Sequence, residues 1–323
     1  MNKPIAIIAG EPNSISSEII FKSWKLRKSY IHKPFIIIGS SHLLNLQKKE
    51  LKYHLKTKKI QKDFSTKDLD KDKLSIYDIN YRQKKSFQKI SSKSNNYIFD
   101  CFTAAINLIN KKKILGFINC PVVKETLFKK KHQGITEFLS KKYKTKNNEV
   151  MLIFNKNLSV SPLTTHISLN QVAKKISKIK IIKKVRVINA FYKKTLKKKP
   201  KIAILGLNPH NFSAAKIKEE NKIIIPAIRI LKKNKIKVVG PISPDTSFML
   251  FKKYKFDVIF GMYHDQVLTP FKALFKYNAI NITLGLPYVR VSPDHGIAQN
   301  IMGKGIADPL SLIESIKFFN YIK

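Results

Sequence analysis

Residues 4–16 read PIAIIAGEPNSIS, a short β-branched run that ends in a turn and passes into a helical pattern. The run Ile5–Ala9 is apolar on both faces, as expected of a strand in a sheet that helices cover on both sides. The spacing of apolar residues over about Ser14–Lys28 predicts the helix that follows. This strand–turn–helix unit is typical of α/β proteins.

The same alternation of short buried strands and amphipathic helices continues along the 323 residues. It predicts an α/β protein with a largely parallel sheet. Further strands are expected at Phe35–Gly39, Ile114–Cys120, Val150–Asn155, Lys201–Leu207, Lys237–Val239, Asp257–Gly261 and Ala279–Leu284. Helices are expected from about Ser41, over Asn95–Lys111, from about Thr136, at the start of Ser168–Tyr192 and over Pro309–Phe319, and loops or edge strands over Lys58–Ser91.

Composition excludes several classes of protein. Hydrophobic residues make up 43% of the chain, too many for a disordered protein. Ile5–Ala9 is too short for a signal peptide, and no apolar stretch approaches the roughly 20 residues of a membrane-spanning helix. Cys101 and Cys120 stand outside any Cys/His cluster, so no disulfide framework or cysteine-based zinc site is indicated. We expect a soluble, cytoplasmic protein without a membrane partner.

The formal net charge of +43 raises the question of a nucleic-acid partner. The excess is nearly all lysine, spread along the whole chain, and there are only five arginines. Reading of bases and bidentate clamping of phosphates favour arginine over lysine. We therefore expect no nucleic-acid partner, although the positive field would attract anionic substrates.

The turn after the first strand lacks a nucleotide-binding fingerprint. Residues 10–16 read GEPNSIS instead of GxGxxG, and no P-loop occurs elsewhere in a chain with only 11 glycines. A dinucleotide, if bound, must therefore be held by another architecture.

Three histidines stand in polar turns that follow predicted buried segments: His166, His210 and His264. Ligands of α/β proteins collect at the carboxyl ends of the strands. Three imidazoles from separate loops would make a site for Zn²⁺ or a similar divalent metal. Because the three are far apart in the chain and form no local metal motif, their spacing leaves their convergence open.

Residues 261–308 carry the densest set of polar candidates and read GMYHDQVLTPFKALFKYNAINITLGLPYVRVSPDHGIAQNIMGKGIAD. Lys272 and Arg290 together could hold a phosphate or a carboxylate. Arg290 is the stronger candidate for binding an anion. Nearly all cationic side chains of this protein are lysines, so an arginine at this position indicates a specific need for it.

This stretch resembles the 4-hydroxythreonine-4-phosphate dehydrogenase family of pyridoxal phosphate biosynthesis. The family's motifs occur in order as Tyr263–Gln266 (YHDQ), Lys272, Asn281–Pro287 (NITLGLP), Arg290 and Asp294–Gly296 (DHG). Shorter matches precede them at Gly10–Pro12, Pro121 with Lys124, Thr136–Phe138, Thr164–His166, Leu207–His210 and Pro244–Thr246. The resemblance therefore covers essentially the full chain.

The resemblance implies a two-domain fold like that of the isocitrate and isopropylmalate dehydrogenases, which bind nicotinamide cofactors without GxGxxG. Residues 1–123 and 255–323 would form the first α/β domain, and residues 124–254 the second, with the metal ligands and the dimer contacts. It also implies a homodimer with a shared active site and NAD or NADP as cofactor. The divalent metal would be Zn²⁺, with Mg²⁺ or Co²⁺ as alternatives.

Residue roles follow from the resemblance. The metal ligands would be His166, His210 and His264, with His264 supplied by the partner subunit, and Asp245 would lie near the metal. Substrate would be bound by Thr136, Lys272, Asn281 and Arg290. The cofactor would be bound by Asp294, His295 and Gly296. Asp245 and Lys272 are the candidates for the catalytic base.

The implied reaction is the metal-dependent oxidation of 4-(phosphooxy)-threonine by NAD(P)⁺ to a 2-amino-3-oxo acid phosphate, followed by decarboxylation. One departure bears on the substrate, since Ile135 stands where the family usually has a histidine before the threonine. Two alternatives therefore remain. The first is a sister dehydrogenase for threonate or erythronate phosphate; the second is a catalytically impaired relative or a basic nucleic-acid-binding protein.

Overall fold

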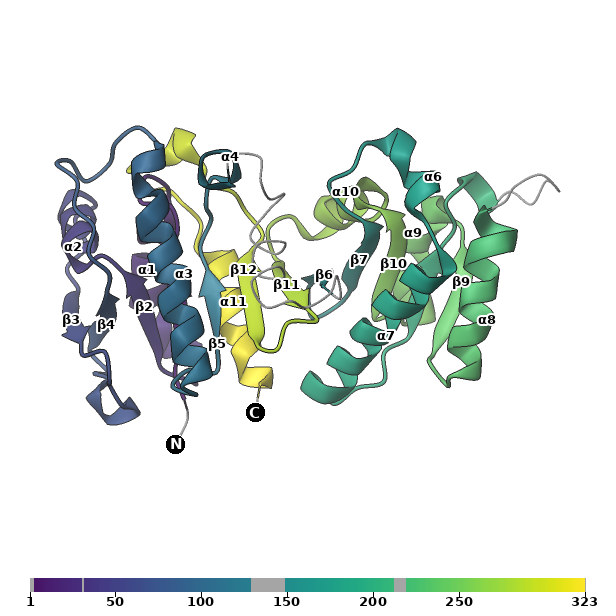
Figure 1. Ribbon diagram of the computed structural model, residues 1–323, viewed down its shortest axis with the longest axis horizontal. Helices are drawn as coiled ribbons and strands as arrows, with labels where there is room; N and C mark the ends of the chain where they lie inside the picture. The colour runs from purple at the N-terminus through teal and green to yellow at the C-terminus, as the bar shows by residue number, and fades with distance from the viewer. Residues whose placement is uncertain (1–2, 31, 129–148, 212–218, 323) are drawn as a thin grey trace. The chain divides into compact units, whose positions relative to one another are not determined.

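The computed structural model describes residues 3–30, 32–128, 149–211 and 219–322 (Figure 1). The chain divides into two compact units, Met1–Phe138 with Pro287–Lys323, and Leu139–Leu286. Its boundaries differ from those of the expected domains at both ends, because residues 124–128 belong to the first unit and residues 255–286 to the second. The reason is strand pairing: β10 (Val258–Tyr263) pairs with β7 (Ser159–Thr164) and β8 (Ile202–Leu205).

The first unit contains a parallel sheet in the order β3-β4-β2-β1-β5-β12. Its strands are β1 (Ile5–Ile8), β2 (Phe35–Gly39), β3 (Lys56–Ile60), β4 (Lys73–Asp78), β5 (Gly116–Asn119) and β12 (Val289–Pro293). Its α-helices are α1 (Ser16–Lys25), α2 (Ser41–Glu50), α3 (Asn95–Asn110), α4 (Lys124–Phe128) and α11 (Leu310–Phe318). Helix α1 packs beside α2 and α11, whereas α3 packs against β1 and β2.

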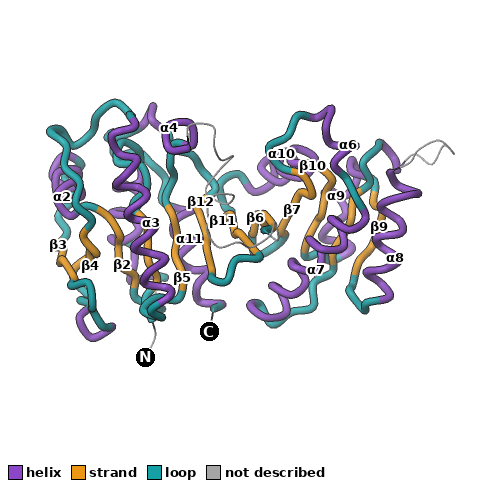
Figure 2. The backbone as a smooth tube through the Cα atoms, in the orientation of Figure 1, coloured by secondary structure: helices purple, strands orange, loops and turns teal. Residues whose placement is uncertain are grey.

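The second unit contains a mixed sheet in the order β11-β6-β7-β10-β8-β9. Besides β7, β8 and β10, its strands are β6 (Val150–Phe154), β9 (Val238–Ile242) and β11 (Ile280–Leu284). Strand β6 lies between β11 and β7 (Figure 2). It runs antiparallel to both, and the other pairs are parallel. Its α-helices are α6 (Val172–Lys175), α7 (Lys178–Thr195), α8 (Ile225–Lys233), α9 (Pro244–Tyr254) and α10 (His264–Phe275).

Most expected elements are present, and the differences have local causes. The segment Lys58–Ser91 contains β4, which lies between β3 and β2 and is not an edge strand. Strand β7 was not expected, because its serines and Pro162 hide the apolar alternation; the Ser161 hydroxyl is satisfied by donating to the Met151 carbonyl at 2.7 Å. Strand β12 was not expected because it contains the buried Arg290. The helix expected from Thr136 lies outside the described residues.

Burial explains why the strands form where they do. Every residue of β1, β2, β5 and β8 is buried, as in sheets covered by helices on both faces. Among the described residues, no helix has the length and apolar character needed to cross a membrane.

Candidate active site

The candidate residues of the second unit follow the carboxyl ends of four adjacent parallel strands. His166 comes after β7, His264 directly follows β10, His210 comes after β8, and Asp245 comes after β9. Because these strands are neighbours in the order β7-β10-β8-β9 and run in the same direction, the four residues lie along one edge of the sheet.

His166 and His264 lie together, with ring centroids 6.0 Å apart. The Nδ1 atom of His264 lies 2.7 Å from Oδ1 of Asp265. A carboxylate accepts this proton, so Nδ1 donates and Nε2 carries the lone pair that a metal would use. This is the arrangement in which a carboxylate orients a metal-binding imidazole.

Two candidate ligands have a left-handed backbone: φ is 45° at His166 and 54° at His210. Residues other than glycine adopt this conformation uncommonly, and at a cost that the surrounding structure must offset. Such residues gather at functional sites, which supports a role for both turns.

His210 has a carboxylate neighbour of its own. Its Nδ1 atom lies 3.6 Å from Oδ2 of Asp245, and both side chains are more than half exposed. The Ser243 hydroxyl donates to Oδ1 of Asp245 at 2.7 Å, and this hydrogen bond is the main cause that lowers the pKa of the Asp245 carboxyl. Asp245 is therefore ionised at neutral pH and is a weak proton acceptor there.

The donor set fits a metal in part. Within the described residues of one chain, no three His, Cys, Asp or Glu side chains are placed to hold a metal ion. His166 lies with His264, and His210 lies with Asp245. The imidazoles, two of them next to carboxylates, suit Zn²⁺ in chemical type. The pairing of His166 with His264 in one chain gives no support to taking His264 from a partner subunit.

Hydrogen bonds from Thr164 and Gln266 tie the histidine loops together. The Thr164 hydroxyl donates to the Met262 carbonyl at 2.8 Å, which joins the loop of His166 to the end of β10. The Gln266 side chain accepts from the Met262 N–H at 2.6 Å and donates to the Gly206 carbonyl at 2.8 Å. Neither residue was among the predicted site residues, although Gln266 is part of the YHDQ motif.

Glu220 holds the loop that carries His210. Its Oε1 atom accepts from the backbone N–H groups of Leu207 and Asn208 at 2.8 and 2.9 Å, and its Oε2 atom accepts from the Asn208 amide at 2.9 Å. Burial acts to raise the pKa of Glu220, but these hydrogen bonds outweigh it and lower the pKa. No sequence signal pointed to Glu220, because its partners precede it across the segment 212–218.

The expected substrate residues Lys272 and Asn281 are half-buried in the second unit, in α10 and β11. Thr136 lies outside the described residues. Arg290 belongs to the first unit, where it is 4% exposed in β12. Its Nε atom donates to Oδ1 of Asn119 in the neighbouring strand β5 at 2.7 Å.

The expected cofactor residues follow β12 in the first unit. The Asp294 N–H donates to the Ser311 hydroxyl at 2.8 Å, and His295 Nδ1 lies 2.9 Å from the Gly296 carbonyl. This loop is joined to the turn after β1, because the Ile15 N–H donates to the Ile297 carbonyl at 3.2 Å.

The turn after β1 also contains Glu11, a buried carboxyl that was not among the predicted site residues. Its side chain accepts from the Asn13 N–H and, more weakly, from the Ser94 hydroxyl. Burial raises the pKa of Glu11 despite these hydrogen bonds.

Known proteins with similar sequences align with this chain over nearly its full length. A protein of Sulfurihydrogenibium sp. (strain YO3AOP1) named 4-hydroxythreonine-4-phosphate dehydrogenase is 38% identical over 99% of this chain and 98% of its own. A protein of Oceanobacillus iheyensis is 35% identical over 97% of this chain and 96% of its own, and its name gives D-threonate 4-phosphate dehydrogenase as a provisional assignment.

Solved structures with similar folds include members of the same family of enzymes. The crystal structure of a 4-hydroxythreonine-4-phosphate dehydrogenase from Klebsiella pneumoniae matches with a TM-score of 0.84 at 28% identity, over 98% of this chain and 97% of the other. A β-decarboxylating dehydrogenase from Thermococcus kodakarensis matches with a TM-score of 0.50 at 11% identity, over 100% and 84%. The latter likeness concerns the fold alone, and it agrees with the predicted α/β fold with largely parallel sheets.

The family described as "Pyridoxal phosphate biosynthetic protein PdxA" matches residues 31–319, which confirms the resemblance drawn from the motifs. With relatives of that family matching over nearly its full length, this chain belongs to the PdxA family of pyridoxal phosphate biosynthetic proteins.

Proposed function

We propose that this protein is an NAD(P)-dependent 4-hydroxythreonine-4-phosphate dehydrogenase of pyridoxal phosphate biosynthesis, acting in the cytoplasm as a homodimer. The observation that carries the proposal is the full-length match to relatives of that name, with the motif residues in place. The histidine and aspartate side chains along one edge of the second sheet give that match a chemical basis.

Substrate binding is proposed for Thr136, Lys272, Asn281 and Arg290. A phosphorylated hydroxy amino acid carries a phosphate and a carboxylate, which require cationic partners. Arg290 suits one of them, because Asn119 holds its Nε atom and so fixes the plane of the guanidinium. A guanidinium held in this way supplies a fixed position as well as a charge. Holding the substrate in a fixed position contributes to the reaction rate.

His166, His210 and His264 are proposed to hold a divalent metal, with Zn²⁺ as the best match to imidazole nitrogen. When bound, the metal would supply a Lewis acid that lowers the pKa of the substrate hydroxyl. Asp265 and Asp245 would keep two of the imidazoles in the orientation and tautomer that bind. The homodimer is proposed from the resemblance to the family, which implies an active site shared by two subunits.

NAD or NADP is proposed to bind at Asp294, His295 and Gly296. When bound there, the nicotinamide would supply the acceptor for the hydride of the carbinol carbon, and a base of the protein would take the hydroxyl proton. The candidates for this base are Asp245 and Lys272, and the lowered pKa of the Asp245 carboxyl keeps it deprotonated at neutral pH, the state in which a carboxylate can accept a proton. The β-keto acid formed would then lose CO₂, and the enolate left behind would take up a proton to give the amino ketone phosphate.

The test is formation of NAD(P)H from 4-phosphohydroxythreonine, followed by absorbance, with and without removal of divalent metal by a chelator. We expect turnover that is lost with the metal, restored by Zn²⁺, and reduced at least a hundredfold in His210→Ala. Turnover by the chelated enzyme, or an unaffected His210→Ala variant, would refute the metal-dependent mechanism. Reduction of neither nicotinamide cofactor would refute the dehydrogenase.

D-Threonate 4-phosphate is a second candidate substrate. Two observations favour it: the Oceanobacillus relative, and Ile135 at the position where the family usually has a substrate-binding histidine. The two substrates differ in an amino or a hydroxyl group at C2, so a comparison of kcat/KM on both decides between them. A preference for threonate phosphate that is reversed by Ile135→His would identify this position as the cause.

A further inference from the structure

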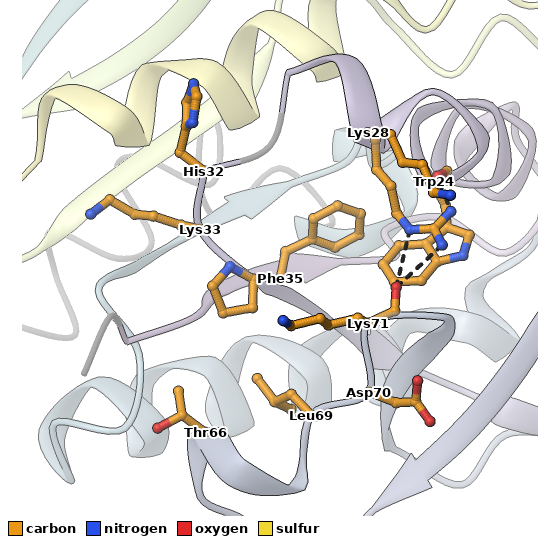
Figure 3. Close-up of a pocket in the computed structure, with 11 residues that line it drawn as sticks. Trp24, Lys28, His32, Lys33, Phe35, Thr66, Leu69, Asp70 and Lys71 are labelled. Carbon is orange, nitrogen blue, oxygen red and sulfur yellow. Dashed lines mark hydrogen bonds between the residues drawn. The ribbon is translucent and has the colours of Figure 1, made fainter.

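We propose that the first unit has a second ligand site, a cavity that binds a small anion with a flat aromatic body. The cavity has a volume of about 370 Å³ and is shown in Figure 3. Its lining residues are Trp24, Arg27, Lys28, His32, Lys33, Pro34, Phe35, Thr66, Leu69, Asp70 and Lys71. The volume lies within the range of small-molecule sites, roughly 300–1,000 Å³.

The cavity lies at the opposite edge of the sheet from the proposed cofactor residues. Phe35 is the first residue of β2, and Lys71 lies just before β4 begins at Lys73. Asp294 and His295, in contrast, follow the carboxyl end of β12. Because β2, β4 and β12 run in the same direction in one sheet, the cavity is separate from the proposed cofactor loop.

Aromatic side chains form the apolar part of the cavity. Trp24 and Phe35 meet edge to face, with ring centroids 5.4 Å apart, and both side chains are buried. Figure 3 shows Phe35 in the middle of the lining residues, with Trp24 on one side and Lys33 and His32 on the other. An aromatic ring is the ligand body that such a surface binds best, through stacked or edge contacts.

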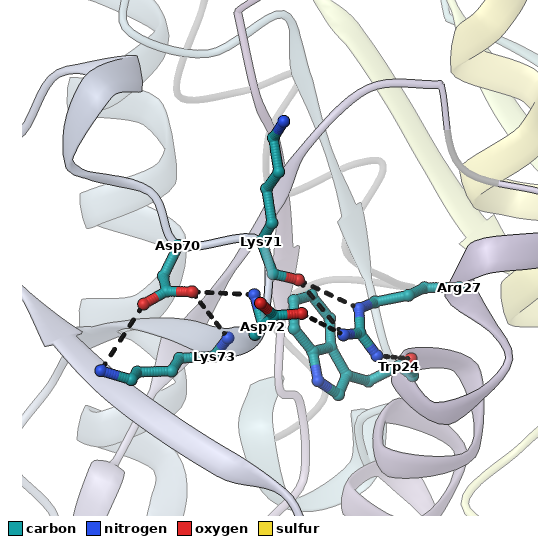
Figure 4. A network of polar contacts seen from close by, with 6 residues as sticks. All are labelled: Trp24, Arg27, Asp70, Lys71, Asp72 and Lys73. Atoms are coloured by element: carbon teal, nitrogen blue, oxygen red, sulfur yellow. Dashed lines mark hydrogen bonds and ion pairs between the residues drawn. The ribbon is translucent and has the colours of Figure 1, made fainter.

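Arg27 fixes the wall of the cavity. Its guanidinium lies 4.2 Å from the centre of the Trp24 ring and donates to the Trp24 carbonyl at 3.1 Å. Two further nitrogens donate to the Lys71 carbonyl at 3.3 and 3.2 Å, and Asp72 lies 3.6 Å away (Figure 4). The end of α1 is thus tied to the loop before β4, so the cavity is formed before any ligand arrives.

The charge around the cavity is positive. Across the described residues, no carboxylate forms an ion pair with the ammonium groups of Lys28, Lys33 or Lys71. The carboxylate of Asp70, which also lines the cavity, accepts from the N–H groups of Asp72 and Lys73 and pairs with the Lys73 ammonium (Figure 4). Three unpaired cations beside an aromatic surface favour an anion with an aromatic ring.

Tryptophan fluorescence can monitor binding in this cavity, because Trp24 is the only tryptophan of the chain. Phenyl phosphate is a suitable probe, with methyl phosphate and benzyl alcohol as controls that lack the ring or the charge. We expect a saturable change in tryptophan fluorescence with phenyl phosphate, and binding at least tenfold weaker for either control. Equal binding of either control compound, or no saturable change, would overturn the proposal.

Two pairs of lysine substitutions test the position of the site. Lys33→Gln with Lys71→Gln removes two cations of the cavity, and Lys49→Gln with Lys111→Gln removes two exposed cations of the same unit elsewhere. Because both double variants change the net charge equally, a general effect of the basic surface cancels. We expect about tenfold weaker phenyl phosphate binding in the first pair only. Equal loss in both pairs, or in neither, would contradict a site in this cavity.

Discussion

The side-chain amide of Gln266 donates to the backbone carbonyl of Gly206 at 2.8 Å, from the first turn of α10 to the end of β8. Its Oε1 atom accepts from the N–H of Met262, two residues before His264. A single buried side chain thus fixes the loop of His264 against the loop of His210. If these histidines bind a metal as proposed, hydrogen bonds that fix their orientation should affect its affinity, since removal of such outer-shell bonds typically costs about 10–100-fold.

Replacement of Gln266 by Glu should therefore weaken metal binding. The carboxylate still accepts from Met262 but no longer donates to Gly206, so one tie between the two loops is lost. We expect a 10–100-fold loss of Zn²⁺ affinity, measured by titration against a chelator. The exposed Gln61→Glu variant makes the same change of charge elsewhere and should bind the metal as the wild type does. Equal affinities for all three proteins would exclude this positioning role.

Asn119 should act on substrate binding through Arg290. In Asn119→Leu the Nε atom of Arg290 loses this acceptor, which costs about 1–3 kcal/mol and weakens the hold on the guanidinium. We expect KM for the phosphorylated substrate to rise about tenfold or more, with a smaller change in kcat. Asn119→Asp keeps an acceptor oxygen and should largely restore KM. A Leu variant with lower stability but unchanged KM would assign Asn119 a structural role only.

Glu18 should contribute strongly to stability. It is 1% exposed, and its Oε1 atom accepts from the Ala307 N–H at 2.7 Å and from the Lys22 ammonium at 2.9 Å. Glu18→Leu leaves the buried Ala307 N–H without this acceptor, while Lys22 keeps the carbonyls of Gly305 and Ala307, and we expect a loss of about 1–3 kcal/mol in the free energy of unfolding by urea. The more accessible pair of Glu314 with Lys317 provides the control, since Glu314→Gln should cost less than about 1 kcal/mol. Similar losses in the two variants would show that burial of Glu18 has no special effect.

Glu11 should make the protein less stable as the pH rises. Burial raises the pKa of this carboxyl above its unfolded value, so the folded state binds the proton more tightly. The resulting stability is present at acidic pH, below the unfolded pKa, and is lost as the pH rises through the folded pKa. Glu11→Gln removes this dependence, so its Tm relative to wild type should increase from acidic to neutral pH. A Tm difference that stays constant with pH would contradict this account.

Local patterns predicted most of the elements, and non-local pairing decided the rest. The run Phe35–Gly39 is apolar throughout, and it is β2 with the same bounds. Strand β7 could not be predicted from the sequence. Its Ser161 hydroxyl can be buried in a strand because it donates to the carbonyl of Met151 on the neighbouring β6. Likewise Glu220 has a role only because the chain returns to Leu207 and Asn208.

The sequence by itself determined the α/β class, the family and the candidate residues, because burial of strands and the order of motifs are local properties of the chain. The tertiary structure alone decided which candidates lie together. Strands β7 and β10 are neighbours in the sheet, so His166 and His264 lie side by side although nearly a hundred residues separate them. Strand order depends on pairing between distant segments, and no periodicity within a segment encodes it.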